Sequence, residues 1–156
     1  MTGKTIAAFI FAIAVTALTA FAMPARAGEG IVLVNSAHDV KTTADKLEKI
    51  LTEKGVTVFA RVNHAAGAES IGQTLRPMEL LVFGNPKLGT PLMQQKQEIG
   101  LDLPLKALVF QGEDGKTYIA YNDPAFLSKR YGVTEPANVF QQMSGALKNF
   151  TAAAAN

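Results

Sequence analysis

The sequence predicts an α+β fold in which a single curved antiparallel sheet carries two main helices on one face. The first observation is that short segments rich in β-branched and aromatic residues alternate with helical segments, as in mixed domains. The second is a pair of strand-like segments, 105–111 and 116–121, that flank the turn sequence Gly112-Glu113-Asp114-Gly115. Because such a hairpin joins antiparallel strands, it argues against an all-parallel sheet.

The first predicted strand, at 31–35, is followed by a helix with clear boundaries. Asp39 can cap this helix, because its carboxylate can accept from free N–H groups of the first turn. Gly55 can end it in a left-handed conformation. Apolar residues at helical spacing form one face of the helix: Val40, Ala44, Leu47, Ile50 and Leu51.

A second strand is predicted at 56–62, with Val56, Val58, Ala60 and Val62 on one side and Thr57, Phe59 and Arg61 on the other. The Ala- and Gly-rich segment 63–72 is predicted to form a short helical turn. A third strand follows at 79–84. Its apolar run from Leu80 to Phe83 does not alternate, which predicts an inner strand covered on both faces.

Three further helices are predicted from capping signals. Thr90-Pro91 begins one that ends at Gly100, and Asp123-Pro124 begins another that ends at Gly132. Thr134 with Pro136 opens the last helix, which has an apolar stripe: Val139, Phe140, Met143, Leu147 and Phe150. Residues 151–156 are predicted to be a frayed tail. The prediction is therefore one domain over 28–150, without internal repeats.

The first 27 residues have the pattern of a secretory signal peptide. Lys4 precedes an uncharged apolar run over 6–23, Pro24 ends any helix, and Ala25-Arg26-Ala27 provides small residues for cleavage. The alternative is an uncleaved anchor, since the run approaches the length that crosses a bilayer. Its many alanines and the adjacent cleavage site favour cleavage after Ala27. We therefore expect a soluble periplasmic protein that begins at Gly28.

Composition excludes several classes of function. The chain has 15 Lys and Arg against 13 Asp and Glu. Lys4 and Arg26 belong to the predicted signal peptide, so the mature chain carries no net charge and gives no support for nucleic acid or an anionic membrane as a partner. The sequence contains no cysteine, which excludes disulfides, thiolate metal sites, thiol catalysis and a lipid-modified N-terminus.

Several motifs resemble one known family. Residues 74–93, TLRPMELLVFGNPKLGTPLM, together with 100–106 and 121–124, are similar to the domain-of-unknown-function 302 family. The segment 63–68, NHAAGA, resembles its exported branch. The resemblance implies a TATA-box-binding-protein-like β-α-β4-α fold, and it implies no established activity, cofactor or catalytic residue. The name of that fold does not imply DNA binding, because function depends on sites rather than folds.

Four polar residues near predicted strand ends are candidate ligand-binding residues: His64, Arg76, Asn85 and Asn122. His64 precedes small residues and could act as a base, a donor or a metal ligand, or it could simply satisfy nearby backbone groups. Arg76 could bind a carboxylate or phosphate, or form a structural ion pair with Glu79 or Glu69. The two asparagines could instead serve as turn residues.

No catalytic, metal or cofactor site is predicted. His38 and His64 are conceivable as a metal pair, but no ligand spacing supports it, and the methionines are more simply core residues. The serines lie in no G-x-S-x-G setting, and Gly84-x₄-Gly89 is followed by Thr90 rather than the lysine of a phosphate loop. The adjacent acids Glu113 and Asp114 are predicted to be solvated at a hairpin tip.

Three functions remain open, in this order. The first is a non-catalytic module that binds a small ligand or a protein partner. The second is a homo-oligomeric structural protein in which a free sheet edge pairs between subunits. The third is an enzyme with His64 as acid or base and Arg76 orienting an anionic group, which requires the two side chains to share a pocket.

Overall fold

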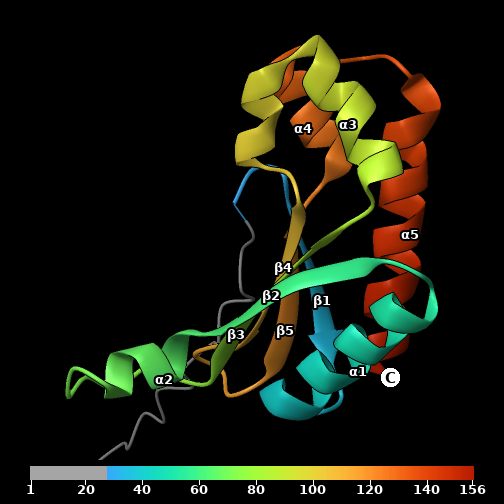
Figure 1. Ribbon diagram of the computed structural model, residues 1–156. Coiled ribbons are helices and arrows are strands. Elements are labelled where there is room, and N and C mark those ends of the chain that lie inside the picture. The colour runs from blue at the N-terminus through green and yellow to red at the C-terminus, as the bar shows by residue number, and fades with distance from the viewer. Residues whose placement is uncertain (1–27) are drawn as a thin grey trace, which may run out of the picture.

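A computed structural model describes residues 28–156. The predicted signal peptide and its cleavage site at Ala27 lie outside the described residues. Five strands and several helices alternate along the chain (Figure 1), in the order β1(Ile31–Ser36), α1(Val40–Glu53), β2(Thr57–Asn63), α2(His64–Glu69), β3(Met78–Gly84), α3(Pro86–Gln95), the 3₁₀ helix η1(Gln97–Leu101), β4(Leu105–Gln111), β5(Thr117–Asn122), α4(Pro124–Tyr131) and α5(Ala137–Ala155).

The five strands form one antiparallel sheet in the order β1-β5-β4-β3-β2. The predicted hairpin joins β4 to β5, with Gln111 opposite Thr117. The strands at the two edges, β1 and β2, come from the first half of the chain. The predicted α+β class and single antiparallel sheet are thus confirmed.

The helices α1 and α5 lie on the same face of the sheet (Figure 1) and enclose the main core. On the strands, Leu81, Ala107, Val109 and Ile119 point to this face and have no exposed surface. They meet the apolar faces of the two helices, including Leu47, Leu51 and Leu147. Burial of each large aliphatic side chain stabilises the fold by about 1.5–3 kcal/mol.

A second core cluster lies at the end of the sheet where α3, η1 and α4 gather around the first half of α5 (Figure 1). Its buried members include Leu92, Ile99, Leu127 and Phe140. Leu105, at the start of β4, packs against both clusters and so joins them.

Two predicted local features are wrong. The helix that was expected to start at Thr90-Pro91 starts earlier, at Pro86, because the Asn85 side chain caps it by accepting from Lys87 N at 2.9 Å. The third strand is an inner strand, as predicted, but its residues alternate between buried and partly exposed, so only one of its faces is covered.

The sides assigned to the second strand also differ from the prediction. A β-bulge between Val58 and Ala60 inserts one extra residue, which reverses the alternation beyond it. As a result Arg61 lies opposite Leu81 on the helix-covered face, and Val62 lies opposite Leu80 on the other face. The alternating pattern alone could not locate this bulge.

The predicted frayed tail is the last turn and a half of a packed helix. α5 continues to Ala155, and Thr151 and Ala154 have no exposed surface. The backbone N–H of Ala37 donates to the carbonyl of Ala155 at 2.9 Å. The segment is ordered because small side chains let the helix approach the end of β1 closely. Among residues 28–156, no helix is long and apolar enough to cross a membrane.

Candidate functional site

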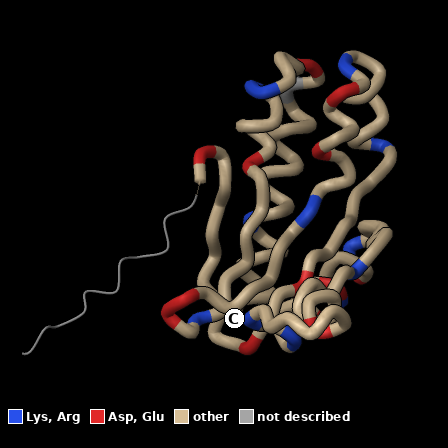
Figure 2. Tube along the Cα trace, turned by 90° about the vertical axis from the view of Figure 1, so that its left-hand side faces the viewer, with Lys and Arg blue, Asp and Glu red and all other residues tan. Residues whose placement is uncertain are grey.

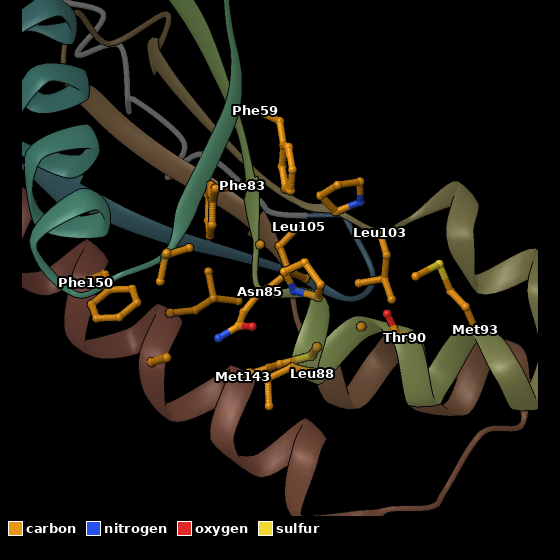
Figure 3. Close-up of a pocket in the computed structure, with 17 residues that line it drawn as sticks. Phe59, Phe83, Asn85, Leu88, Thr90, Met93, Leu103, Leu105, Met143 and Phe150 are labelled. Carbon is orange, nitrogen blue, oxygen red and sulfur yellow. The ribbon is translucent and has the colours of Figure 1, made fainter.

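An apolar cavity of about 190 Å³ lies between the two core clusters (Figure 3). The ends of β3 and β4 form one wall through Phe83 and Leu105, and α3 forms a second through Leu88 and Met93. The third wall is α5, whose lining residues follow helical spacing: Met143, Ala146, Leu147 and Phe150. Phe59, from the bulge in β2, stands over the cavity in Figure 3.

Two glycines, Gly84 and Gly89, are among the residues that line this space. A Cβ added at Gly84 would lie 3.4 Å from Pro104 Cβ, and one added at Gly89 would lie 3.8 Å from Leu103 Cδ1. Both distances are ordinary van der Waals contacts, so a methyl group at either position would fit against the cavity wall without a clash. Asn85 and Pro86, which connect β3 to α3, also line the cavity.

The described residues that line the cavity include no charged side chain. Its walls are hydrocarbon and the thioethers of Met93 and Met143. Asn85 and Thr90 are exposed and supply the polar side chains at its rim. Asn85 Oδ1 accepts from Lys87 N, which leaves the amide Nδ2 able to donate to a ligand.

The four predicted binding residues divide between the two ends of the sheet. Asn85 follows β3 and Asn122 ends β5, and these strands run in the same direction. Only Asn85 lines the apolar cavity; Asn122 pairs with Ile31 on the edge strand. His64 and Arg76 lie at the opposite end, after β2 and before β3.

In residues 28–156, no hydrogen bond or ion pair joins His64 to Arg76. His64 is the first residue of α2, and the side chain of Asn63 caps that helix. Arg76 Nε donates to the carbonyl of Gln111 at 3.1 Å, and its guanidinium lies 3.9 Å from Glu113. Arg76 therefore pairs with neither acid that the sequence suggested, and an enzymatic site shared by these two residues has no geometric support.

His38, the other histidine, has hydrogen-bond partners close to it in the sequence. Its Nε2 lies 2.8 Å from Lys46 Nζ, and its backbone N–H donates to Ser36 Oγ. Within residues 28–156, no group of three or more histidine, aspartate or glutamate side chains is arranged to hold a metal ion.

A charged cluster on the helix-covered face was not predicted. Arg61 Nε lies 2.5 Å from Glu79 Oε2, and its Nη1 lies 2.7 Å from Asp45 and 2.8 Å from Glu48. Burial lowers the pKa of Arg61, but these three carboxylates outweigh that effect and raise it above its ordinary value. Three carboxylates surround the one guanidinium, so the cluster is a structural link between α1 and the sheet and does not favour an anionic ligand.

Comparisons with known proteins agree with this fold. The model of the family "Domain of unknown function DUF302" matches residues 32–150. The chain belongs to the DUF302 family. Among solved structures, the crystal structure of an uncharacterized conserved DUF302 protein from Bacillus stearothermophilus superimposes with a TM-score of 0.64 at 22% identity. The match covers 82% of this chain and 97% of that one. It shows only the fold of this DUF302 protein.

Curated relatives of this DUF302 chain are larger proteins. Fluoride-specific ion channel FluC 1 of Brucella suis biovar 1 (strain 1330) is 45% identical over 104 residues, which are 67% of this chain and 41% of the relative. Fluoride-specific ion channel FluC 2 of Brucella melitensis biotype 1 matches with the same identity over 38% of its length. The chain thus spans about two fifths of the curated relatives it matches.

Proposed function

We propose that this DUF302 domain is a non-catalytic binding module for a small, neutral, mainly apolar molecule held in the cavity between α3, α5 and the sheet. The observation that carries the proposal is the 190 Å³ volume with uncharged walls and polar side chains only at the rim. An apolar cavity of about 150 Å³ accommodates benzene, so this one suits a ligand of roughly six to ten non-hydrogen atoms.

The apolar lining of the cavity sets the affinity that we expect for such a ligand. Each buried methylene contributes about 0.8 kcal/mol, so a six-carbon body gains roughly 5 kcal/mol, which corresponds to a Kd of about 0.1–1 mM. A hydroxyl or carbonyl on the ligand would face Asn85 and Thr90 and fix its orientation. A charged group would have no partner among the described lining residues, and its desolvation would oppose binding.

Methyl NMR tests this proposal with 1-hexanol and toluene as probes. Met93 and Met143 line opposite walls, so both methyl signals should shift on titration. The variant Ala146→Phe fills the cavity from α5 and should abolish the shifts, whereas Ala152→Phe places the same ring on an exposed part of that helix and should preserve them. Unchanged signals in the native protein, or equal shifts in both variants, would contradict the proposal.

The N-terminal pattern supports a proposal for the cellular compartment in which the domain works. We propose that the domain works in the periplasm after cleavage behind Ala27, as the signal-peptide pattern supports. N-terminal sequencing of the protein from its native cells should begin at Gly28. A membrane-bound product that retains Met1 would exclude this location.

A second candidate function rests on the relatives. Segments 45% identical to this chain occur within proteins named fluoride-specific ion channels. We propose that the domain can also serve as an accessory to such a channel. A strain that lacks the gene should then grow less well in fluoride, with rescue by the native gene and normal growth in chloride. Equal growth of the two strains in fluoride would remove this candidate.

A further inference from the structure

The sheet face opposite α1 and α5 is apolar and has no helix packed over it among the described residues (Figure 1). Residues that pair directly across strands share a face, so the register identifies its members. One continuous row crosses all five strands: Leu33, Ala120, Leu108, Leu80 and Val62. The adjacent row is Asn35, Tyr118, Phe110 and Met78, in which the two aromatic rings lie 5.8 Å apart. We call this surface the open face.

The open face differs from an ordinary solvent-facing sheet surface. In an antiparallel sheet with one covered face, the other face is normally polar. Here Lys106 is the one charged side chain among the described strand residues on that face. Figure 2 views the molecule from this side, and the charged residues gather mainly around the ends of the strands. A surface of this composition has the character of an interface.

An exposed arm lies beside the open face. The arm, residues 64–77, consists of α2 and the loop that returns to β3. It projects away from α5 (Figure 1), while part of it borders the start of α1 at Val40 and Lys41. α2 has no buried residue. Two large apolar side chains of the loop face solvent, with Ile71 74% and Leu75 48% exposed. At the base of the arm, Val62 continues the apolar row to the sheet edge and is 41% exposed.

We propose that the open face binds a second copy of this chain in a two-fold pair, with each arm extending along the partner. The low charge of the open face favours self-association, because a surface whose single charged strand residue is Lys106 meets its own copy without strong repulsion. Five strands about 4.8 Å apart and six residues long cover roughly 500 Å². Two such faces therefore bury about 1,000 Å² before the arms are added, which is where specific interfaces begin.

The geometry favours the open face over the β2 edge of the sheet as the contact. The bulge between Val58 and Ala60 interrupts β2, which forms one edge. Bulges of this kind obstruct edge-to-edge pairing. Face-to-face packing instead covers the apolar rows, whose burial supplies the favourable free energy.

Light scattering of the full-chain protein at micromolar concentration tests the proposal, and the expected mass is that of two copies. Val62→Lys places a charge on the open face, and Leu75→Lys places one on the arm. Both positions are exposed, so the monomer should keep its circular dichroism spectrum while dimer affinity falls tenfold or more. Ala153→Lys introduces the same charge on the exposed side of α5 and should leave the dimer intact.

Cross-linking gives an independent measurement. The chain has no cysteine, so Leu108→Cys introduces a single thiol at the middle of the open face. A bismaleimide about 10 Å long matches the separation of two packed sheets and should join two copies. Ala153→Cys should yield no cross-linked dimer. A monomeric mass in light scattering overturns the proposal. This includes the outcome in which residues 6–23 of the same chain, rather than a second copy, cover the open face. A dimer that both Val62→Lys and Leu75→Lys leave unchanged overturns it as well.

Discussion

Arg61 and Glu79 form an ion pair across β2 and β3 on the helix-covered face, with Arg61 Nε 2.5 Å from Glu79 Oε2. The Glu79 side chain is only 12% exposed, and the Arg61 side chain is 23% exposed. Arg61 also reaches Asp45 and Glu48 on α1, so one guanidinium ties the helix to the sheet through three carboxylates. The cluster stabilises the packing of α1 against the edge strand.

Removal of the two partners should have unequal effects. Arg61→Met leaves Glu79 buried without its cation, removes the partner of Glu48 and leaves Asp45 with Lys41 alone, so we expect a loss of about 2–4 kcal/mol in the free energy of unfolding. Glu79→Gln keeps an acceptor oxygen, and Arg61 retains its other two partners, so the loss should be about 1 kcal/mol. Urea unfolding measures both variants. Equal losses would show that the cluster does not depend on the shared guanidinium.

Acid should weaken the same region. Hydrogen bonds from Lys41 and then Arg61 hold the pKa of Asp45 below its ordinary value. A carboxyl whose pKa is lower in the folded state contributes its stabilisation in full above the unfolded pKa, about 3.9, and loses it as the pH falls through the folded value. Asp45→Asn should therefore flatten the fall of the urea midpoint below about pH 4. Added salt should reduce this difference, and an unchanged slope would refute the assignment.

Deletion of residues 151–156 distinguishes a packed helix end from a frayed tail. A chain that ends at Phe150 loses the buried Thr151 and Ala154 and the hydrogen bond from Ala37 N to Ala155 O. We expect a loss of about 3 kcal/mol from the lost burial and hydrogen bonding. Thermal unfolding provides the measurement. Deletion of the exposed Asn156 alone is the control and should change stability little.

The start of α3 makes a similar prediction for two neighbouring polar residues. Asn85→Ala removes the cap of the helix and should cost about 1 kcal/mol of unfolding free energy, whereas Asn85→Ser should retain most of it. Thr90→Ala lies within the helix and should be neutral or slightly stabilising. The reverse order in urea unfolding would place the cap at Thr90.

Local sequence signals were sufficient where a residue acts on its immediate neighbours. Asp39 accepts from Thr42 N and starts α1 as predicted, and β4 occupies the predicted segment 105–111. In the apolar stripe of α1, Val40, Ala44, Leu47 and Leu51 are buried as the spacing indicated, and Ile50 is partly buried. These features depend on hydrogen bonds within a turn and on side-chain periodicity, both of which a short segment contains.

The candidate site depends on contacts between distant segments. Of the four polar residues proposed from the sequence, only Asn85 lines the cavity, and its other walls come from apolar residues that the sequence marked simply as core. The space lies where Gly84 and Gly89 face Pro104 and Leu103, which come from a different segment of the chain. No local pattern records such a separation.

The sequence by itself determined the α+β class and the main helix faces, because capping, periodicity and turn chemistry act over a few residues. Membership of the DUF302 family rests instead on the resemblance of whole motifs and on the family model that matches residues 32–150. Tertiary structure decided which side of the sheet each strand residue occupies and where α5 ends. The bulge at Val58/Ala60 turned Arg61 toward α1, and the packing of Ala154 and Ala155 ordered the C-terminus. Both outcomes arise from burial against distant segments, which local propensity does not contain.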